Sequence, residues 1–181
     1  MKLKETRIAA LATDGFDAKE LYGLLEAFKI EGATVDIVSI QNGYIKPAGT
    51  NVRSSTLKVN QKVDSSPVHN YDALVLTGGA INLEQLKEHT LALNFIKAFI
   101  ERTKPVGAIG QAPYLFVASD LLEGKKVTSS LDIKEDIMNA GGKWIDEKVV
   151  VDNGLVTCGK TDNLSMFCTK FIKEIIKQND K

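Results

Sequence analysis

Cysteine is scarce in this sequence, which contains only Cys158 and Cys168. Two cysteines are too few for the disulfide framework of a secreted domain, and their spacing is not that of a zinc site. The N-terminus also lacks the apolar core and the small-residue cleavage site of a signal peptide. We therefore expect a protein of the reducing cytoplasm that binds no metal and no cofactor.

An excess of charge of either sign is missing as well. Lys plus Arg and Asp plus Glu each number 23 among 181 residues, so the formal net charge is +0. This balance gives no electrostatic argument for nucleic acid, and no apolar run is long enough to cross a bilayer. We expect neither nucleic acid nor a membrane as a partner. No linker or repeat divides the sequence, so we predict a single domain over residues 1–181.

Short apolar runs alternate with segments of helical spacing. Strands are predicted at residues 7–12, 34–39, 71–76 and 105–109. Helices are predicted around residues 21–28, 83–88, 91–102, 113–120, 134–140 and 164–175. One or two short strands are expected between Val52 and Val63, and a hairpin over 149–157 turns at Asn153–Gly154. This alternation predicts an α/β fold, a flavodoxin-like three-layer sandwich with a mostly parallel central sheet and helices on both faces.

Ligands of open parallel sheets bind beyond the carboxyl ends of the strands. Here the loops after residues 12, 76 and 109 are expected to meet at that edge. Gly78 and Gly79 lie in the second loop, where exposed backbone N–H groups could hold an oxyanion or a bound anion. The same pair is also consistent with a plain strand-to-helix turn.

The third loop has the strand–turn–helix pattern of a nucleophile elbow, with Gly110 at the turn. Glycine adopts positive φ without strain, but it offers no nucleophile. Gln111 follows it and can donate and accept hydrogen bonds, although it cannot act as a general base near neutral pH. The pattern predicts elbow geometry without the usual chemistry.

Asp17, in the first loop, has two interpretations. It could be an acid or a hydrogen-bonding group in the pocket, or it could be a helix N-cap. Glu20, three residues later, favours the N-cap because the pair resembles a capping box.

The order of these motifs resembles the PfpI-type intracellular protease/amidase and stress-protein family, in the DJ-1/PfpI branch of the class I glutamine amidotransferase-like fold. The resemblance covers nearly the whole chain. It is carried by ATDGFDAKEL (12–21), YDALVLTGG (71–79), KPVGAI (104–109), VTS (127–129), NAGGKWIDEKVVVDNGLVT (139–157) and DNLSMFC (162–168).

The elbow departs from the family pattern. The family usually reads Ala-Ile-Cys-His-Gly-Pro, so Gly110 replaces the reactive cysteine and Gln111 the adjacent histidine. By this comparison Asp17 falls at the position of a glutamate that hydrogen-bonds the cysteine, and Thr77 stands where a proline is usual. The resemblance implies protease, amidase, deglycase, glyoxalase or chaperone functions, but glycine cannot supply a thiolate.

Neither the other cysteines nor the histidines restore the missing pair. Cys158 and Cys168 are expected to be small buried hydrophobic residues, and His69 and His89 to be solvent-exposed.

Three hypotheses remain. The first is a non-catalytic homologue with a stress-related role, whose pocket of Asp17, Gly78, Gly79, Gly110 and Gln111 binds a small polar ligand or nothing. The second is an enzyme in which Asp17 acts as the acid or base and the Gly78 and Gly79 amides stabilise negative charge. The third is a subunit whose function lies in an interface. The resemblance implies a homo-oligomer, either a dimer or a larger ring.

Overall fold

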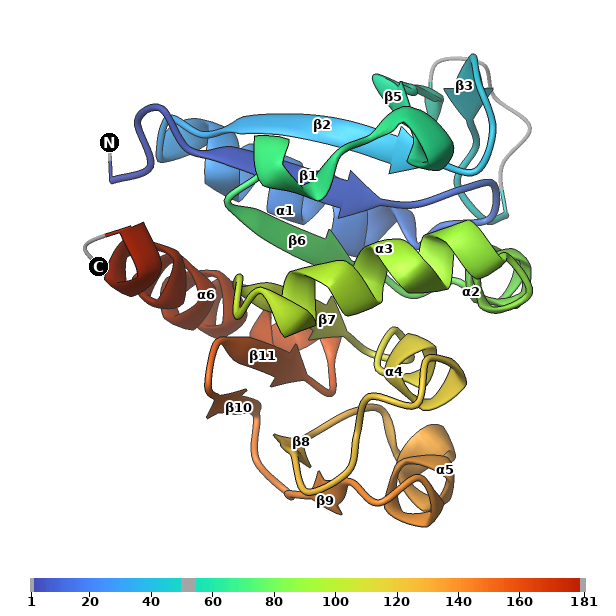
Figure 1. Cartoon of the computed structure of the whole chain (residues 1–181), viewed down its shortest axis with the longest axis vertical. Coiled ribbons are helices and arrows are strands. Elements are labelled where there is room, and N and C mark those ends of the chain that lie inside the picture. The colour runs from blue at the N-terminus through green and yellow to red at the C-terminus, as the bar shows by residue number, and fades with distance from the viewer. Residues whose placement is uncertain (1, 50–54, 180–181) are drawn as a thin grey trace.

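The computed structural model describes residues 2–49 and 55–179. Within them a seven-stranded sheet has the order β10-β11-β7-β6-β1-β2-β5 (Figure 1). Its strands are β1 (Arg7–Leu11), β2 (Thr34–Ser39), β5 (Gln61–Lys62), β6 (Ala73–Leu76), β7 (Val106–Ile109), β10 (Val149–Asp152) and β11 (Leu155–Cys158). Neighbouring strands pair in parallel, except that β10 and β11 form the antiparallel hairpin. The predicted mostly parallel sheet is confirmed.

Helices cover both faces of this sheet, as predicted. They are α1 (Ala18–Ile30), α2 (Ala80–Lys87), α3 (Thr90–Glu101), α4 (Tyr114–Ala118), α5 (Lys134–Asn139) and α6 (Leu164–Asn179). Helices α1 and α6 lie behind the sheet in Figure 1, and α3 lies in front of it. Short 3₁₀ turns are η2 (Val63–Ser65), η3 (Val68–Asn70), η4 (Leu131–Ile133) and η5 (Thr161–Asn163).

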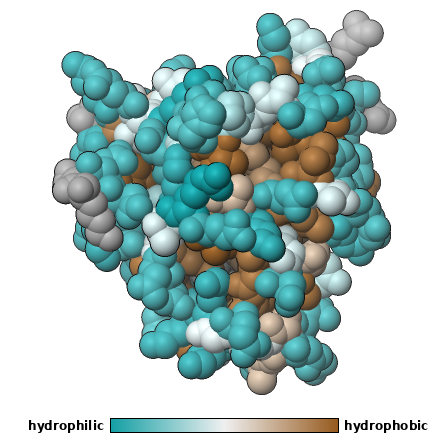
Figure 2. All heavy atoms as spheres, in the orientation of Figure 1, coloured by the Kyte–Doolittle hydropathy of each residue, from teal (hydrophilic) through white to brown (hydrophobic). Residues whose placement is uncertain are grey.

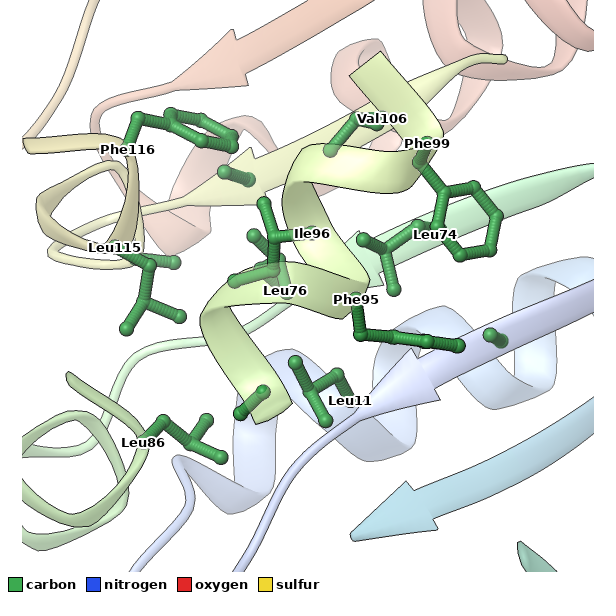
Figure 3. Packing of buried hydrophobic residues seen from close by; sticks show 14 of the residues in the cluster. Leu11, Leu74, Leu76, Leu86, Phe95, Ile96, Phe99, Val106, Leu115 and Phe116 are labelled. Carbon is green, nitrogen blue, oxygen red and sulfur yellow. The ribbon is translucent and has the colours of Figure 1, made fainter. Parts of the chain in front are cut away.

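The central strands are apolar on both faces because each face meets a layer of helices. In β1, Ala9 and Leu11 join the core on the α3 side, whereas Ile8 and Ala10 join the core on the side of α1 and α6. Figure 3 shows side chains of α3 packed over those of the strands. The labelled residues of this cluster are Leu11, Leu74, Leu76, Leu86, Phe95, Ile96, Phe99, Val106, Leu115 and Phe116. The apolar runs in the sequence therefore mark strands that are buried on both faces of the sheet.

Several short elements differ from expectation. The strands β3 (Tyr44–Ile45) and β9 (Lys143–Trp144) were not predicted, and they are ordered by pairing with β4 (Leu57–Lys58) and β8 (Lys126–Val127). The strands β4 and β5 fall in the segment where short strands were expected, although Val52, where that segment begins, lies outside the described residues.

The two histidines have different surroundings. His69 is exposed, as expected. His89 is half-buried and is the N-cap of α3, where its ring nitrogen accepts a hydrogen bond from the Ala92 N–H at 3.3 Å. The expectation of a solvent-exposed residue was therefore wrong for His89, because the ring is held against the first turn of the helix.

Hydrophilic side chains dominate the face shown in Figure 2, and hydrophobic ones show between them. Among the helices of residues 2–49 and 55–179, none is both long enough and apolar enough to cross a membrane.

Candidate functional site

The elbow predicted after β7 is present. Gly110 is buried and has φ +63°, in the left-handed region that glycine tolerates. Its N–H donates to the Cys158 carbonyl at 2.8 Å, which ties the turn to the end of β11. The chain then enters α4 at Tyr114. The backbone therefore has elbow geometry with no side chain at its apex.

A cavity of about 480 Å³ opens at this turn. It includes all five residues that the sequence placed in one pocket, together with residues of α1, Ser130 and residues that follow β11. The lining residues are Asp17, Lys19, Glu20, Gly78, Gly79, Gly110, Gln111, Ser130, Gly159, Lys160, Thr161 and Asp162. Residues from five segments of the chain, those that follow β1, β6, β7, β8 and β11, thus meet in this cavity, and four of these segments follow parallel strands of the central sheet.

The carboxyl group beside Gly110 belongs to Glu20. A β-carbon at position 110 would lie 2.9 Å from Glu20 Oε1. Glu20 Oε2 accepts the Gly78 N–H at 2.6 Å, and Oε1 accepts the hydroxyl of Thr161 at 3.3 Å. The residue is only 4% exposed. The motif comparison, which put Asp17 at the glutamate position, was therefore wrong about which carboxyl group adjoins the elbow.

Asp17 serves as the N-cap of α1 and also lines the cavity. Its Oδ1 accepts the Glu20 N–H at 3.0 Å, which confirms the capping interpretation. The reciprocal half of a capping box is absent, because the Asp17 N–H donates to the Gly78 carbonyl at 3.1 Å. Glu20 is thereby free to turn toward the elbow.

A sequence signal for Glu20 did exist. The residue lies four positions before Leu24 and next to Leu21, so helical periodicity places it at the edge of the buried stripe of α1. A carboxylate at such a position needs a polar partner inside the protein.

Burial raises the pKa of Glu20 to about 7, and the charge of Asp17 acts in the same direction. The hydrogen bonds from Gly78 and Thr161 favour the ionised form and offset part of this rise in pKa. A carboxyl group with this pKa exists in both protonation states near neutral pH. It can therefore donate or accept a proton in the cavity.

The two loop glycines differ in availability. The N–H of Gly78 already donates to Glu20, so it is not a free donor for a ligand. Gly79 caps α2, and a β-carbon there would lie 2.1 Å from the Gly15 carbonyl oxygen. Of the predicted pair of amides, only that of Gly79 is left to face a bound anion.

Gln111 is held by a neighbouring turn. Its side-chain amide donates to Oδ2 of Asp132, in η4. The amide group is thereby oriented at the rim of the cavity.

The two cysteines lie outside the cavity lining. Both are free and buried, as the sequence predicted. Burial raises the pKa of both thiols, that of Cys168 to about 11. Cys158 also donates its S–H to the Lys160 carbonyl at 3.1 Å. Since the thiolate is the reactive form, neither residue is suited to replace the missing nucleophile.

A second cavity of about 410 Å³ adjoins the first. The two share Ser130, Gly159, Lys160 and Asp162. Trp144, the single tryptophan of the chain, lines the second cavity. Its indole N–H donates to the hydroxyl of Ser129 at 3.0 Å, which fixes the ring in the wall.

The sequence pattern that defines the DJ-1/PfpI family matches residues 6–174. The chain belongs to the DJ-1/PfpI family. It is 34% identical over 168 residues to a deglycase of Thermococcus kodakarensis, covering 92% of this chain and 98% of the relative. It is 31% identical over 167 residues to the deglycase PfpI of Pyrococcus furiosus, with coverages of 92% and 98%.

Solved structures of this DJ-1/PfpI family share the fold. The match to Schizosaccharomyces pombe DJ-1 has a TM-score of 0.81 at 18% identity and covers 97% of each chain. A two-domain protein from Anabaena variabilis, with DJ-1/ThiJ/PfpI-like and ferritin-like domains, matches with a TM-score of 0.88 at 24% identity. That match covers 94% of this chain and 48% of the Anabaena protein.

Proposed function

We propose that this DJ-1/PfpI-family protein binds a small polar ligand in the Gly110 cavity and performs no thiol chemistry there. The observation that carries the proposal is the contact between Gly110 and Glu20. Position 110 has no side chain, and the Glu20 carboxyl group stands 2.9 Å from where one would begin. Two relatives are named deglycases, and this favours a ligand with a carbonyl or amine group. The deglycase activity itself is attributed only to those relatives.

The lining supports a ligand rich in oxygen and nitrogen. Lys19 and Lys160 contribute cations, and Asp17 and Asp162 contribute anions. Glu20 can donate a hydrogen bond to a ligand oxygen when it is protonated and can accept one when it is ionised. Such a mixed lining suits small carbonyl compounds, amides or carboxylates more than an apolar molecule.

A second candidate is a hydrolase or glyoxalase-like enzyme that uses a carboxyl group as its acid or base. The sequence suggested Asp17 for that role. The pKa of about 7 favours Glu20 instead, because a group that titrates near neutral pH can transfer a proton in either direction. The reacting group would occupy the space above Gly110.

The test is an NMR titration with small carbonyl compounds, amides and anions, combined with turnover assays on the same compounds. Saturable shifts of the Gly79 and Gly110 amides without turnover are the expected result. Turnover that is lost in Glu20→Gln, but kept in the exposed control Glu26→Gln, would favour the enzyme over the binding protein. No shift and no turnover with any compound would reject both.

We also propose that the protein forms a homo-oligomer. A surface groove runs between α1 and α6, and Ile30 on its edge is 67% exposed. An exposed apolar side chain in a groove suits contact with a second copy. Light scattering at micromolar concentration tests this, and a monomer would contradict it. The stress-related role and the cytoplasmic location stay predictions.

A further inference from the structure

Asn82 connects the loops that form the cavity, although it does not line the cavity itself. It lies in α2 and is fully buried. Its Oδ1 accepts the Thr13 N–H, after β1, at 2.8 Å. Its Nδ2 donates to the Thr77 carbonyl at 3.1 Å and to the Gly78 carbonyl at 3.2 Å, after β6. One neutral side chain therefore ties the ends of two adjacent strands together.

The peptide group between Thr77 and Gly78 connects Asn82 with Glu20. Its carbonyl oxygen accepts from Asn82, and its N–H donates to Glu20 Oε2 at 2.6 Å. A peptide group is planar, so fixing the direction of its C=O also fixes the direction of its N–H. Hydrogen bonds at the two ends of one amide also strengthen each other by polarisation.

We propose that Asn82 is a positioning residue for this site: by holding the Thr77–Gly78 peptide, it fixes how Glu20 presents its carboxyl group to the space above Gly110. The proposal rests on the proposed function only in taking this cavity as the functional site. Asn82 makes no contact with the ligand in this proposal, because its side chain already forms hydrogen bonds with three backbone groups.

Other groups also act on Glu20, and the test has to separate their effects from that of Asn82. Asp17 and Lys19 approach from α1, whereas Lys160 and Asp162 line the cavity from the loop after β11. The Cys158 thiol is close enough for the two groups to influence each other electrostatically. Asp17 acts on Glu20 through its charge, and Thr161 acts through its hydrogen bond to Oε1. Asn82 is neutral, so its removal acts through the orientation of the peptide.

The experiment follows the titration of the Glu20 side-chain carboxyl carbon by ¹³C NMR in the ligand-free protein. Asn82→Ala removes the whole clamp without adding charge. Asn82→Leu also removes the clamp without adding charge, and it keeps more of the side-chain volume. In both variants we expect the Glu20 midpoint to rise by about one pH unit, because a hydrogen bond that favours the ionised form is weakened. The Gly78 amide proton should shift upfield at the same time.

Leu86→Ala is the matched control. Leu86 is also fully buried on α2, but it packs in the core on the α3 side. Its truncation should destabilise the protein and leave the Glu20 midpoint where it is. A midpoint in Asn82→Ala equal to that of the unmodified protein would overturn the proposal, as would an equal shift in Leu86→Ala.

A measurement on the unmodified protein decides the question if the variants do not fold. The side-chain NH₂ resonances of Asn82 should titrate with the same midpoint as Glu20, because the shared peptide connects them. Resonances that do not change with pH would contradict the proposal. Neither readout needs a ligand, so failure here is distinct from failure to bind one.

Discussion

The carboxyl group of Glu20 lies beside Gly110, where a side chain at position 110 would begin. A β-carbon at that position would lie 2.9 Å from Glu20 Oε1. The two residues are 90 positions apart in the sequence, which is long enough for the contact to depend on the whole fold. The absence of a side chain at the elbow is thus matched by a buried carboxyl group that reaches toward it.

Gly110→Ala should reveal this contact as a loss of stability. An alanine at φ +63° costs about 1–2 kcal/mol from backbone strain alone. The Glu20 carboxyl group must also move. Gly124→Ala is the control, because Gly124 has φ +72° and a β-carbon there would meet no atom within 4 Å. Urea unfolding should show a larger loss for Gly110→Ala, and equal losses would mean that the Glu20 contact has no energetic effect.

The native protein should be slow to react with a thiol reagent. Cys158 and Cys168 are buried and burial raises the pKa of both, so little thiolate is exposed at pH 7. Gly110→Cys should add one thiol that reacts faster than the other two, because Gly110 lines the cavity and they do not, and in denaturant all thiols should react. Ellman's reagent, followed over time, measures this. Fast reaction of the unmodified native protein would contradict the burial of Cys158 and Cys168.

Stability should fall as the pH rises through neutrality. Burial raises the pKa of Glu20 from its ordinary value of 4.5 to about 7 in the folded protein. The folded state therefore binds this proton more tightly than the unfolded state does. This contribution is fully present below pH 4.5 and is lost as the pH passes 7. Its size is on the order of 3 kcal/mol for a shift of this extent.

Glu20→Gln removes that titration. The free energy of unfolding of this variant should lack the decline between about pH 5 and pH 8 that Glu20 causes in the unmodified protein. Glu26→Gln, exposed on the same helix, should keep the decline. Urea unfolding at a series of pH values measures all three proteins. An identical decline in Glu20→Gln and the unmodified protein would mean that another group titrates.

Gly107→Ala should disturb the core between β7 and α6. A β-carbon at Gly107 would lie 2.6 Å from Phe167 Cζ and 3.2 Å from Phe171 Cε2. Overpacking of this kind costs about 1–3 kcal/mol, because the stacked rings have to shift. Thermal or urea unfolding gives the loss, and a stability equal to that of the unmodified protein would show that α6 moves freely on the sheet.

The sequence by itself determined the elements that depend on local pattern. Apolar runs predicted β1, β2, β6 and β7, because strands buried on both faces carry few polar residues. The N-cap at Asp17 could be read from its spacing to Glu20, and the elbow at Gly110 from its place between a strand and a helix. The residue type alone shows that position 110 carries no nucleophile, because glycine has no side chain.

The tertiary structure alone decided which groups meet. The strands β3 and β9 have too few residues to give a periodic signal in the sequence. They form because β3 pairs with β4 and β9 pairs with β8. The sequence put forward Asp17 as the carboxylate of the site and gave Glu20 only as the partner of a capping box in α1. Glu20 took the place beside Gly110 because its side chain reaches the Gly78 N–H, 58 residues away, where a buried carboxyl group needs a donor. Contacts over such separations follow from how the strands are ordered in the sheet, which local spacing does not encode.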